Sequence, residues 1–561
     1  MNNIVVEALY YKSVALNVTA GRPGFAENAA CFNARARVYL AKTIKTQSAS
    51  RRQGGKIMEK GFDSEKYLRE QSEAILERAS HFGDKLYLEF GGKLICDFHA
   101  ARVLPGFDPD AKIKLLQRLK DKVDIIICIY AGAIEEKKIR ADFGVSYDVD
   151  TMRTIDDLRE WGLNVRAVVV TRYCDQPAVQ VFLNRLSRRG ISVYTHRPIA
   201  GYPTDVDTIA GPQGYGANAY IETERPIVVV TGPGPNSGKM GTCLSQVYHD
   251  FQRGIRAGYA KFETFPVWNL PLKHPVNLAY EAATADLADV NMVDPFHLEA
   301  RGEVAINYNR DVEIFPVVRR ICARIMPPEQ LYVSPTDMGV NRVGFAITDD
   351  AAVRKAATQE IIRRYFKELC NHAQGLAEKS VPDRVKLLMD ELGVNELDRK
   401  VVAPARQAAQ EAENSPGKGN DGIFCGAALE LHDGTIVIGR NSPLLHAASS
   451  CVINAIKHLA GLPDDLKLLS PQVIDSLSRL KHDVFKNRQI SLGLTETLTA
   501  LSVSSPSNPA ADLALRKLGE LAGCEMHLSH MPGTGDESGL RRLGINVTSE
   551  PVFANRNLFM E

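Results

Sequence analysis

Residues 225–242 read RPIVVVTGPGPNSGKMGT, and this stretch decides the fold class. The apolar run Ile227–Val230 has the length of a buried strand, a glycine-rich segment follows it, and Gly238-Lys239 opens the helical pattern Met240–Arg253. A strand joined to a helix in this way is the building unit of a parallel sheet covered by helices. Glycines let backbone N–H groups close around an anion, and the helix N-terminus adds unpaired donors. We therefore predict an α/β protein with a phosphate-binding loop.

The loop departs from both common nucleotide-binding patterns. The P-loop spacing G-x-x-x-x-G-K-[ST] requires glycine at 233 and a hydroxyl at 240, where this chain has Pro233 and Met240. The glycines at 232, 234 and 238 approximate a dinucleotide fingerprint, and Glu263 ends the next predicted strand, where a ribose-binding acid would lie. A glycine turn needed only for strand–helix packing is the third interpretation. The lysine directly after the last glycine favours a nucleoside triphosphate.

We accordingly expect ATP or GTP with Mg²⁺ as the cofactor. The predicted cofactor-binding residues are Gly232, Gly234, Asn236, Ser237, Gly238, Lys239, Thr242 and Glu263, with Lys239 also a catalytic candidate. Thr242 would offer its hydroxyl to magnesium, and Asp294 in DPFHLE or Asp337 in SPTDMG would supply a carboxylate. Solvated loops and turns are the alternative interpretation of both acidic segments.

A second polar group follows an N-terminal strand. Asp97 and His99 come just after the run Lys93–Phe98, and ligands of parallel sheets usually bind beyond the carboxyl ends of strands. We therefore name Asp97 and His99 as further catalytic candidates. However, Gly91-Gly92 between Lys85–Phe90 and Lys93–Phe98 predicts a two-residue hairpin, which weakens this placement.

Composition limits the function classes. The chain has 561 residues, of which 45% are apolar, which is enough for several globular domains. Its 68 basic and 67 acidic side chains nearly cancel, so no global field favours nucleic acid or anionic lipid. The ten cysteines form no C-x-x-C pair, and no apolar run approaches the roughly 20 residues of a membrane helix. We expect a cytoplasmic protein acting on a small molecule, without nucleic-acid or membrane partners.

Patterning divides the chain into five segments. Residues 1–57 are basic and poor in acids, and we interpret them as an extension preceding a natural start at Met58; a disordered arm or a transit peptide are the alternatives. Residues 58–350 form the P-loop-like or Rossmann-like core with the loop at 231–242. Residues 351–413 are helical with a break at Val381-Pro382, and 414–422 (NSPGKGNDG) form a linker. Residues 423–561 form a C-terminal α/β domain.

The C-terminal domain resembles the cytidine-deaminase-like fold. Residues 426–441 predict strand, turn and strand, a helix follows from His446, and strands are predicted at Ala500–Ser505, Cys524–His530 and Ile545–Thr548. That family holds zinc on His-Ala-Glu and Pro-Cys-x-x-Cys. Here the corresponding segments read His446-Ala447-Ala448 and Pro506-Ser507-Asn508-Pro509-Ala510, so the resemblance implies a version without zinc ligands. An unrelated α/β sandwich is the alternative.

Longer phrases resemble a known bacterial family. LEFGGKLICDFHAARVLPGFDP, GPGPNSGKMGTCLSQVYHD, AGYAKFETFPVWNLPLKHPVNLAYEAATADL and HMPGTGDESGLRRLGIN are similar to a conserved family catalogued as a domain of unknown function, over Met58 to Glu561. Some of its members are labelled ATP-dependent peptidases, but no peptidase motif is present. The resemblance implies a P-loop-like core, a distinct C-terminal domain and a homo-oligomer, and it supplies no catalytic residues.

We therefore expect an ATP- or GTP-dependent ligase, kinase or hydrolase. A non-catalytic, oligomeric nucleotide or metabolite sensor or scaffold is the first alternative. An NAD(P)-dependent oxidoreductase is the second.

Overall fold

The computed structural model describes residues 60–140, 144–487 and 489–555, so the predicted extension 1–57 lies outside the described residues. Its largest element is a six-stranded sheet in the order β6-β5-β2-β7-β1-β8, and every pairing is parallel. The strands are β1 (Lys85–Phe90), β2 (Val123–Tyr130), β5 (Asn164–Thr171), β6 (Val193–His196), β7 (Ile227–Thr231) and β8 (Ala257–Phe262). The prediction of an α/β protein with a parallel-sheet core is confirmed.

The position of β7 matters most for the site. The chain runs from β1 outward through β2 and β5 to β6, then returns and inserts β7 between β2 and β1. All five residues of β7 are buried, as expected for a central strand covered on both faces. The glycine loop therefore leaves the sheet where the strand order reverses, which is the usual position of ligand sites in such sheets.

The predicted hairpin at Gly91-Gly92 is wrong. β1 pairs in parallel with β7 on one side and β8 on the other, so neither edge is free for an antiparallel neighbour. The chain after β1 is irregular until α4 (Phe98–Val103), and Gly92 has φ +68°. Gly91 and Gly92 therefore follow the end of a central strand, and the strands that pair with it, β7 and β8, lie far along the chain.

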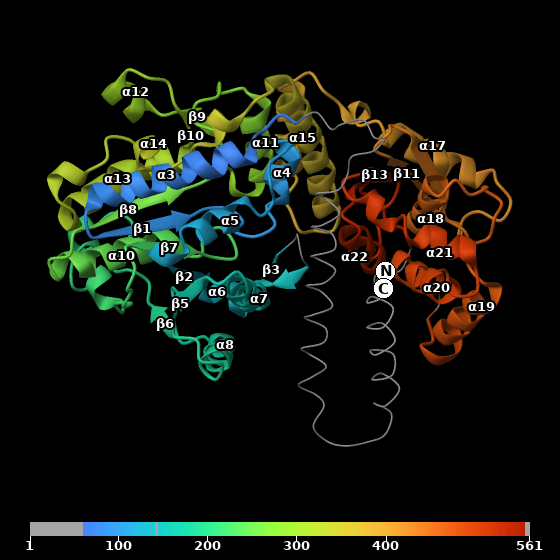
Figure 1. Cartoon of the computed structure of the whole chain (residues 1–561), viewed down its shortest axis with the longest axis horizontal. Helices are drawn as coiled ribbons and strands as arrows, with labels where there is room; N and C mark the ends of the chain where they lie inside the picture. The colour runs from blue at the N-terminus through green and yellow to red at the C-terminus, as the bar shows by residue number, and fades with distance from the viewer. Residues whose placement is uncertain (1–59, 141–143, 488, 556–561) are drawn as a thin grey trace, which may run out of the picture.

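Helices cover both faces of this sheet (Figure 1). On one face the hydroxyl of Tyr87 donates to Asp250 of α10 at 2.8 Å. On the other face Gly258 lies so close to Phe82 of α3 that an added Cβ would meet the ring at 2.1 Å. The larger helices of this region are α3 (Ser64–Phe82), α5 (Ala111–Arg118), α7 (Tyr147–Glu160), α8 (Pro177–Ser187), α10 (Lys239–Gln252), α11 (Pro275–Ala283) and α13 (Asn309–Ile325).

Shorter elements complete this part of the chain. They are α6 (Ala131–Glu135), α9 (Val206–Ile209), α12 (Pro295–Arg301), α14 (Pro335–Met338) and the two-stranded pairs β3 (Ile139–Arg140) with β4 (Val145–Ser146) and β9 (Asn291–Val293) with β10 (Ile306–Tyr308). Residues 339 and 340 run beside the outer edge of β8, where the N–H of Val340 donates to the carbonyl of Lys261 at 2.7 Å.

The helical middle segment consists of α15 (Asp350–Ala373), α16 (Ser380–Glu391) and α17 (Val402–Glu413). The predicted break at Val381-Pro382 is wrong, because the chain interrupts the helix between Ala373 and Ser380 instead. Pro382 lies in the first turn of α16, where its missing N–H costs no hydrogen bond. Figure 1 shows α15 lying between the N-terminal sheet and the C-terminal part of the chain.

The C-terminal part has its own four-stranded sheet, in the order β12-β11-β13-β14. β11 is antiparallel to both neighbours, and β13 and β14 are parallel. The predicted strand Ala500–Ser505 is wrong, because it lies in α20, whose buried residues 494, 497, 500, 501 and 504 follow a helical period. The elements are β11 (Gly426–Glu430), β12 (Ile436–Arg440), β13 (Glu525–Leu528), β14 (Asn546–Ser549), α18 (Ala447–Leu459), α19 (Pro471–Arg479), α20 (Leu494–Ser504), α21 (Pro509–Leu515) and α22 (Thr534–Arg542).

Within the described ranges, every helix falls short of the length or the apolar character needed to cross a bilayer.

Candidate functional site

The glycine loop, residues 232–238, is pressed against β5 and α7. Gly238 has φ +85°, and a Cβ there would lie 2.7 Å from the side chain of Thr171. A Cβ on Gly234 would lie 2.4 Å from the hydroxyl of Tyr147. Any larger residue would displace the loop, so both positions require glycine.

Hydrogen bonds to its carbonyl groups fix the shape of the loop. The hydroxyl of Thr171 donates to the carbonyl of Ser237 at 2.9 Å, and the Ser237 hydroxyl donates to the carbonyl of Gly234 at 3.0 Å. Arg172, which follows β5, donates to the carbonyl of Asn236. Its guanidinium lies 3.6 Å from the centre of the Tyr130 ring. These contacts with the rest of the protein hold the loop in place.

The backbone N–H groups of the loop, unlike its carbonyl groups, lack hydrogen-bond partners in the described part of the chain. Across the part of the chain that the structure describes, the N–H groups of Gly234 and of residues 236–241 donate to no protein acceptor. The N–H of Thr242 is the first in α10 to find one, the carbonyl of Gly238 at 3.0 Å. Lys239 Nζ lies 3.4 Å from both the Gly234 carbonyl and the Ser237 hydroxyl. Unpaired donors and an ammonium group are the requirements of an anion site.

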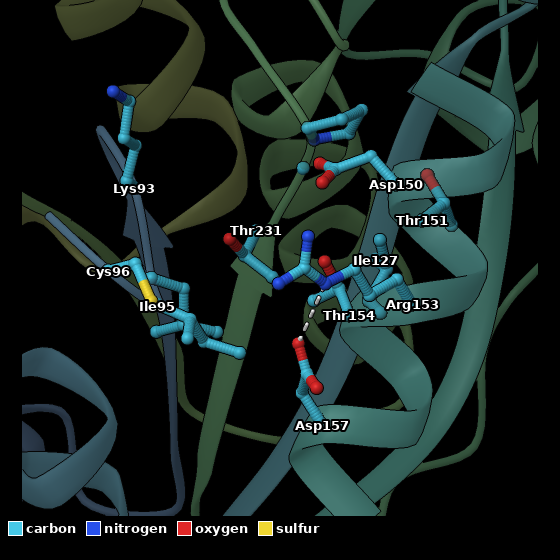
Figure 2. A pocket seen from close by; sticks show the side chains of 13 residues that line it. Lys93, Ile95, Cys96, Ile127, Asp150, Thr151, Arg153, Thr154, Asp157 and Thr231 are labelled. Carbon is cyan, nitrogen blue, oxygen red and sulfur yellow. Dashed lines mark ion pairs between the residues drawn. The ribbon is translucent and has the colours of Figure 1, made fainter. Parts of the chain in front are cut away.

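A small cavity lies on the sheet side of this loop (Figure 2). Its volume is about 30 Å³, and it is bounded by Lys93–Cys96, by Thr231–Pro233 and by α7. Burial raises the pKa of Asp157 to about 6, although Arg153 lies 3.7 Å away. This space holds one or two water molecules, so a nucleotide would have to bind on the open side of the loop.

The predicted metal ligands are not brought together. The hydroxyl of Thr242 is buried and accepts the thiol of Cys128 in β2 at 3.4 Å. Asp337 lies beside β8 and pairs with Arg301 at 2.9 Å. β7 and β1 separate β2 from β8, so three strand spacings, roughly 14 Å, lie between the two groups.

Asp294 has a structural role. One of its carboxylate oxygens accepts the N–H groups of Phe296 and His297 and caps α12. The other accepts the N–H and the hydroxyl of Thr336, at 3.1 and 2.7 Å. Asp294 thereby joins α12 to α14. No group of three or more His, Cys, Asp or Glu suited to a metal ion occurs among the described residues.

Asp97 and His99 are likewise engaged within the protein. Asp97 caps α4 and lies 3.0 Å from Lys112 Nζ; burial opposes its ionisation, but Lys112 lowers the pKa of Asp97 overall. His99 Nδ1 lies 3.0 Å from Glu360 Oε1, and burial lowers the pKa of His99. Neither side chain is directed to the glycine loop by a described contact.

The structure gathers Lys261, Glu263 and Asp311 into a charged cluster at the ends of β1 and β8, a grouping that the sequence does not show. Lys261 Nζ donates to Asp311 and to the Tyr308 hydroxyl at 3.0 Å, and it lies 3.4 Å from Glu263. The Tyr308 hydroxyl lies 2.8 Å from both carboxylate oxygens of Glu263. Glu89, on β1, accepts the hydroxyl of Tyr259 at 2.6 Å. Burial raises the pKa of Glu263, while the neighbouring acids outweigh burial and raise that of Lys261.

This cluster changes the interpretation of Glu263. Its carboxylate occupies the predicted place after β8, but Tyr308 and Lys261 already contact it. The available signal was a charged residue in an otherwise buried strand, Glu89 in KLYLEF and Lys261 in AGYAKF. Such residues need partners, because an unpaired buried charge is costly.

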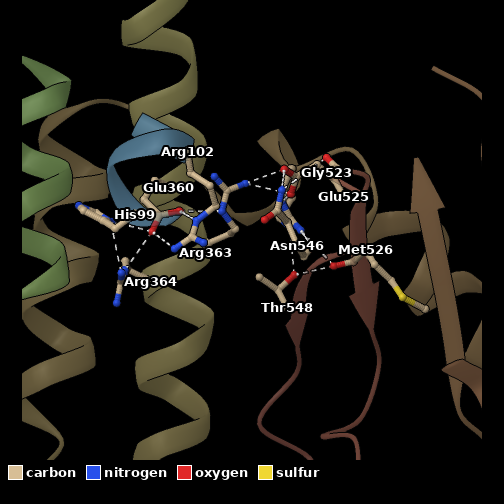
Figure 3. A network of polar contacts seen from close by, with 11 residues as sticks. His99, Arg102, Glu360, Arg363, Arg364, Gly523, Glu525, Met526, Asn546 and Thr548 are labelled. Carbon is tan, nitrogen blue, oxygen red and sulfur yellow. Dashed lines mark hydrogen bonds and ion pairs between the residues drawn. The ribbon is translucent and has the colours of Figure 1, made fainter. Parts of the chain in front are cut away.

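A second charged network joins the two sheets (Figure 3). Glu360 of α15 is buried and accepts from Arg102 at 2.8 Å, from Arg363 at 2.8 Å and from Arg364 at 3.1 Å. Arg363 also reaches Glu525 of β13 at 2.9 Å. Arg399, fully buried, donates to Glu525 at 2.6 Å. The N-terminal core and the C-terminal sheet are therefore connected through buried ion pairs.

His446 lies at the start of α18 and forms an imidazole–carboxylate pair. The ring nitrogen Nδ1 of His446 is 2.7 Å from Asp536 Oδ2, and the backbone N–H of His446 donates to the carbonyl of Leu492 at 3.1 Å. Leu492 and Gly493 directly precede α20, so the helix that begins beside the His446 ring is α20. The predicted second segment, 506–510, lies instead between the end of α20 and the first turn of α21.

Comparison with known proteins gives the family. The family model described as domain of unknown function DUF1846, N-terminal, matches residues 60–393, and its C-terminal counterpart matches residues 397–559. A UPF0371 protein of Clostridioides difficile (strain 630) is 55% identical over 502 residues, covering 90% of this chain and 100% of that protein. A UPF0371 protein of Fusobacterium nucleatum is 55% identical over 504 residues, covering 90% and 99%. The predicted resemblance is confirmed, and the chain belongs to the DUF1846 family.

Proposed function

We propose that this chain binds ATP or GTP at residues 232–239 and uses it in phosphoryl transfer, ligation or hydrolysis on a small molecule. One observation carries the proposal: the N–H groups of Gly234 and of residues 236–241 have no acceptor among the described residues, and Lys239 is turned back over them. Phosphate oxygens would satisfy these donors with charge-assisted hydrogen bonds, which are stronger than the present 3.4 Å contacts of Lys239.

Two further features support a phosphate at this place. The loop follows β7, where the strand order reverses. Arg172 is exposed and lies against the loop, so its guanidinium adds a second positive charge beside Lys239. Both cations would stabilise the charge of a transferring phosphoryl group.

Magnesium fits this site less well than the nucleotide does. Thr242 keeps its hydroxyl against Cys128, and Asp294 and Asp337 hold protein donors beyond β8. We therefore derive no step through a metal ion. This misfit favours the second candidate function, a nucleotide sensor or scaffold that binds without turnover.

The C-terminal domain is proposed to be a relative of the cytidine-deaminase-like fold without its zinc chemistry. The antiparallel pair β11–β12 followed by α18, with His446 directly before the helix, supports this relation. Asp536 contacts the ring nitrogen of His446 that faces it, and Ala448 stands where the catalytic glutamate would be. A role in assembly of a homo-oligomer is the proposed use of this domain.

Nucleotide binding is tested by calorimetry with ATP and with GTP on the full chain. Lys239→Ala should weaken binding about tenfold to a hundredfold, because a charged hydrogen bond contributes roughly 1.5–3 kcal/mol. Lys273→Ala is the matched control, since Lys273 is exposed and pairs with Glu391 at 2.7 Å. Equal affinities for wild type and Lys239→Ala, or no binding by wild type, would refute the proposal.

Single-turnover assays with γ-labelled ATP then separate the two candidates. Release or transfer of label that Lys239→Ala abolishes identifies an enzyme. Binding without any loss of label identifies the sensor.

A further inference from the structure

A cavity of about 670 Å³ lies along the outer edge of β8 and is separate from the glycine loop. α3, α12 and the segment 330–342 line it. Its volume is in the range of roughly 300–1,000 Å³ typical of small-molecule sites. Apolar walls come from Trp268, Ile306, Leu331 and Tyr332.

The cavity is lined by polar side chains that are themselves buried. Lys261, Asp311 and Asn307 each expose 8% of their surface, and His297 and Gln330 expose 6%. Burying polar and charged groups is costly unless each of them is paired. A group around the cavity that lacks a partner within the protein is therefore a candidate for contact with a ligand.

The side-chain oxygen of Gln330 receives no hydrogen bond from the described residues. Gln330 Nε2 donates toward the carbonyls of His81 and Phe82, at 3.5 and 3.3 Å, and this fixes the orientation of the amide. Its Oε1 is buried and has no hydrogen-bond partner in the described part of the chain. Because this oxygen has almost no exposed surface, a ligand in the cavity would not reach it.

The end of the cavity at β8 carries an excess of negative charge. Lys261 is shared between two carboxylates, Asp311 and Glu263, which leaves one formal negative charge on the trio. Only one oxygen of Asp311 receives the ammonium group of Lys261. This end therefore favours a hydroxyl or amino group of a ligand.

Arg342 also lines the cavity. The guanidinium of Arg342 pairs with no carboxylate of the described residues and lies 5.4 Å from the centre of the Phe345 ring. In contrast, Arg301 pairs with Asp337 at 2.9 Å. Arg78 has no carboxylate partner among the described residues either, but its guanidinium already donates to the Asp337 carbonyl at 2.9 Å and to the Tyr332 hydroxyl at 3.2 Å. Arg342 is thus the cation best placed to receive an anionic group.

We infer that this cavity binds a small carboxylic acid that carries a hydroxyl or amino group, with the carboxylate at Arg342 and the donor group at Asp311. Resting on the proposed function, this ligand would be the second substrate. β8 lies two strands from β7, about 10 Å, and the cavity lies beyond β8. Glu89 lies on the strand between them and bonds Tyr259 of β8.

Four three-carbon probes test this inference by saturation-transfer NMR on the full chain without nucleotide: L-lactate, L-alanine, propionate and propane-1,2-diol. Lactate or alanine should receive saturation, and which of them does so distinguishes the hydroxyl from the amine. Propionate lacks the donor and propanediol lacks the carboxylate, so both should give signals weaker by about fivefold or more.

Variants locate the binding. Arg342→Ala should reduce the signal of the bound probe about fivefold or more, and Arg342→Gln, which keeps most of the side-chain length, serves if the alanine variant does not fold. Arg516→Ala is the control, because Arg516 is exposed and pairs with Asp512. The inference is overturned if no probe receives saturation, if all four probes are equivalent, or if the Arg342 variants bind as wild type does.

A failure here is distinguishable from a failure of the proposed function. Lys239→Ala should lose nucleotide affinity and keep the probe signals, and Arg342→Ala should keep nucleotide affinity. The two results are read out separately.

Discussion

Glu360→Gln should destabilise the protein strongly while leaving the volume of the side chain unchanged. Glu360 exposes 1% of its surface and accepts from Arg102, Arg363 and Arg364 at distances between 2.8 and 3.1 Å, with His99 at 3.0 Å. Burial opposes its ionisation, but the three guanidinium groups hold the pKa of Glu360 well below its usual range. Neutral glutamine would leave these guanidinium groups facing one another without the anion between them.

The size of the effect follows from this geometry. Removing one partner of a buried ion pair costs roughly 3–5 kcal/mol, because the remaining charge stays desolvated. We expect Glu360→Gln to lie in that range at neutral pH. Since the pKa of Glu360 is lowered on folding, its contribution is complete above about pH 4.3 and is lost as the pH falls through the folded-state value.

Urea unfolding at neutral pH, followed by far-UV circular dichroism, measures the change. The matched control is Glu537→Gln, which removes an exposed i,i+4 pair with Arg541 and should cost less than about 1 kcal/mol. A loss for Glu360→Gln no larger than that of the control would refute this account of the network.

Three further predictions concern the loop and the C-terminal domain. Gly238→Ala should abolish nucleotide binding in calorimetry, because its Cβ would meet Thr171 at 2.7 Å and Gly238 has a positive φ. Gly241→Ala is the control and should bind normally, because its Cβ would meet only the end of a side chain at 3.2 Å. Equal effects of the two substitutions would contradict the loop geometry. Arg172→Ala should weaken nucleotide binding about tenfold, through loss of one cation and of the tie to the loop, with unchanged thermal unfolding as the control. Burial disfavours the charged form of His446, but Asp536 raises the pKa of His446 overall, so its contribution is full below about pH 6.5 and is lost as the pH rises through the folded value. Asp536→Asn should therefore lower stability more at about pH 6 than at about pH 9 in thermal unfolding, and the opposite order would contradict the pair.

Much of the architecture could be predicted from local pattern. β2 spans Val123–Tyr130, and its unbroken apolar run is the local pattern of a strand buried on both faces. The glycine loop and the beginning of α10 were expected for a similar reason, since strand, glycines and lysine follow one another directly. Both features depend on residues that are neighbours in the chain.

The errors arise where distant segments decide the structure. The sequence around Gly91-Gly92 cannot show that β7 and β8, more than a hundred residues later, take both edges of β1. Arg172 is an ordinary residue after a strand until the order β5-β2-β7 places it beside the loop. Asp294 is different, because Asp before Pro is a helix-start signal, and this local rule favours capping over metal binding.

The insertion of β7 between β2 and β1 also has a consequence for synthesis on the ribosome. β1 and β2 emerge early but share no hydrogen bonds with each other, and the strand that joins them ends only at Thr231. Until then the nascent chain carries apolar strands with open edges, which are prone to associate with other chains. A chain released before residue 231 should therefore be recovered in aggregates, and one released after β8, at Phe262, should have all six strands available to close the sheet.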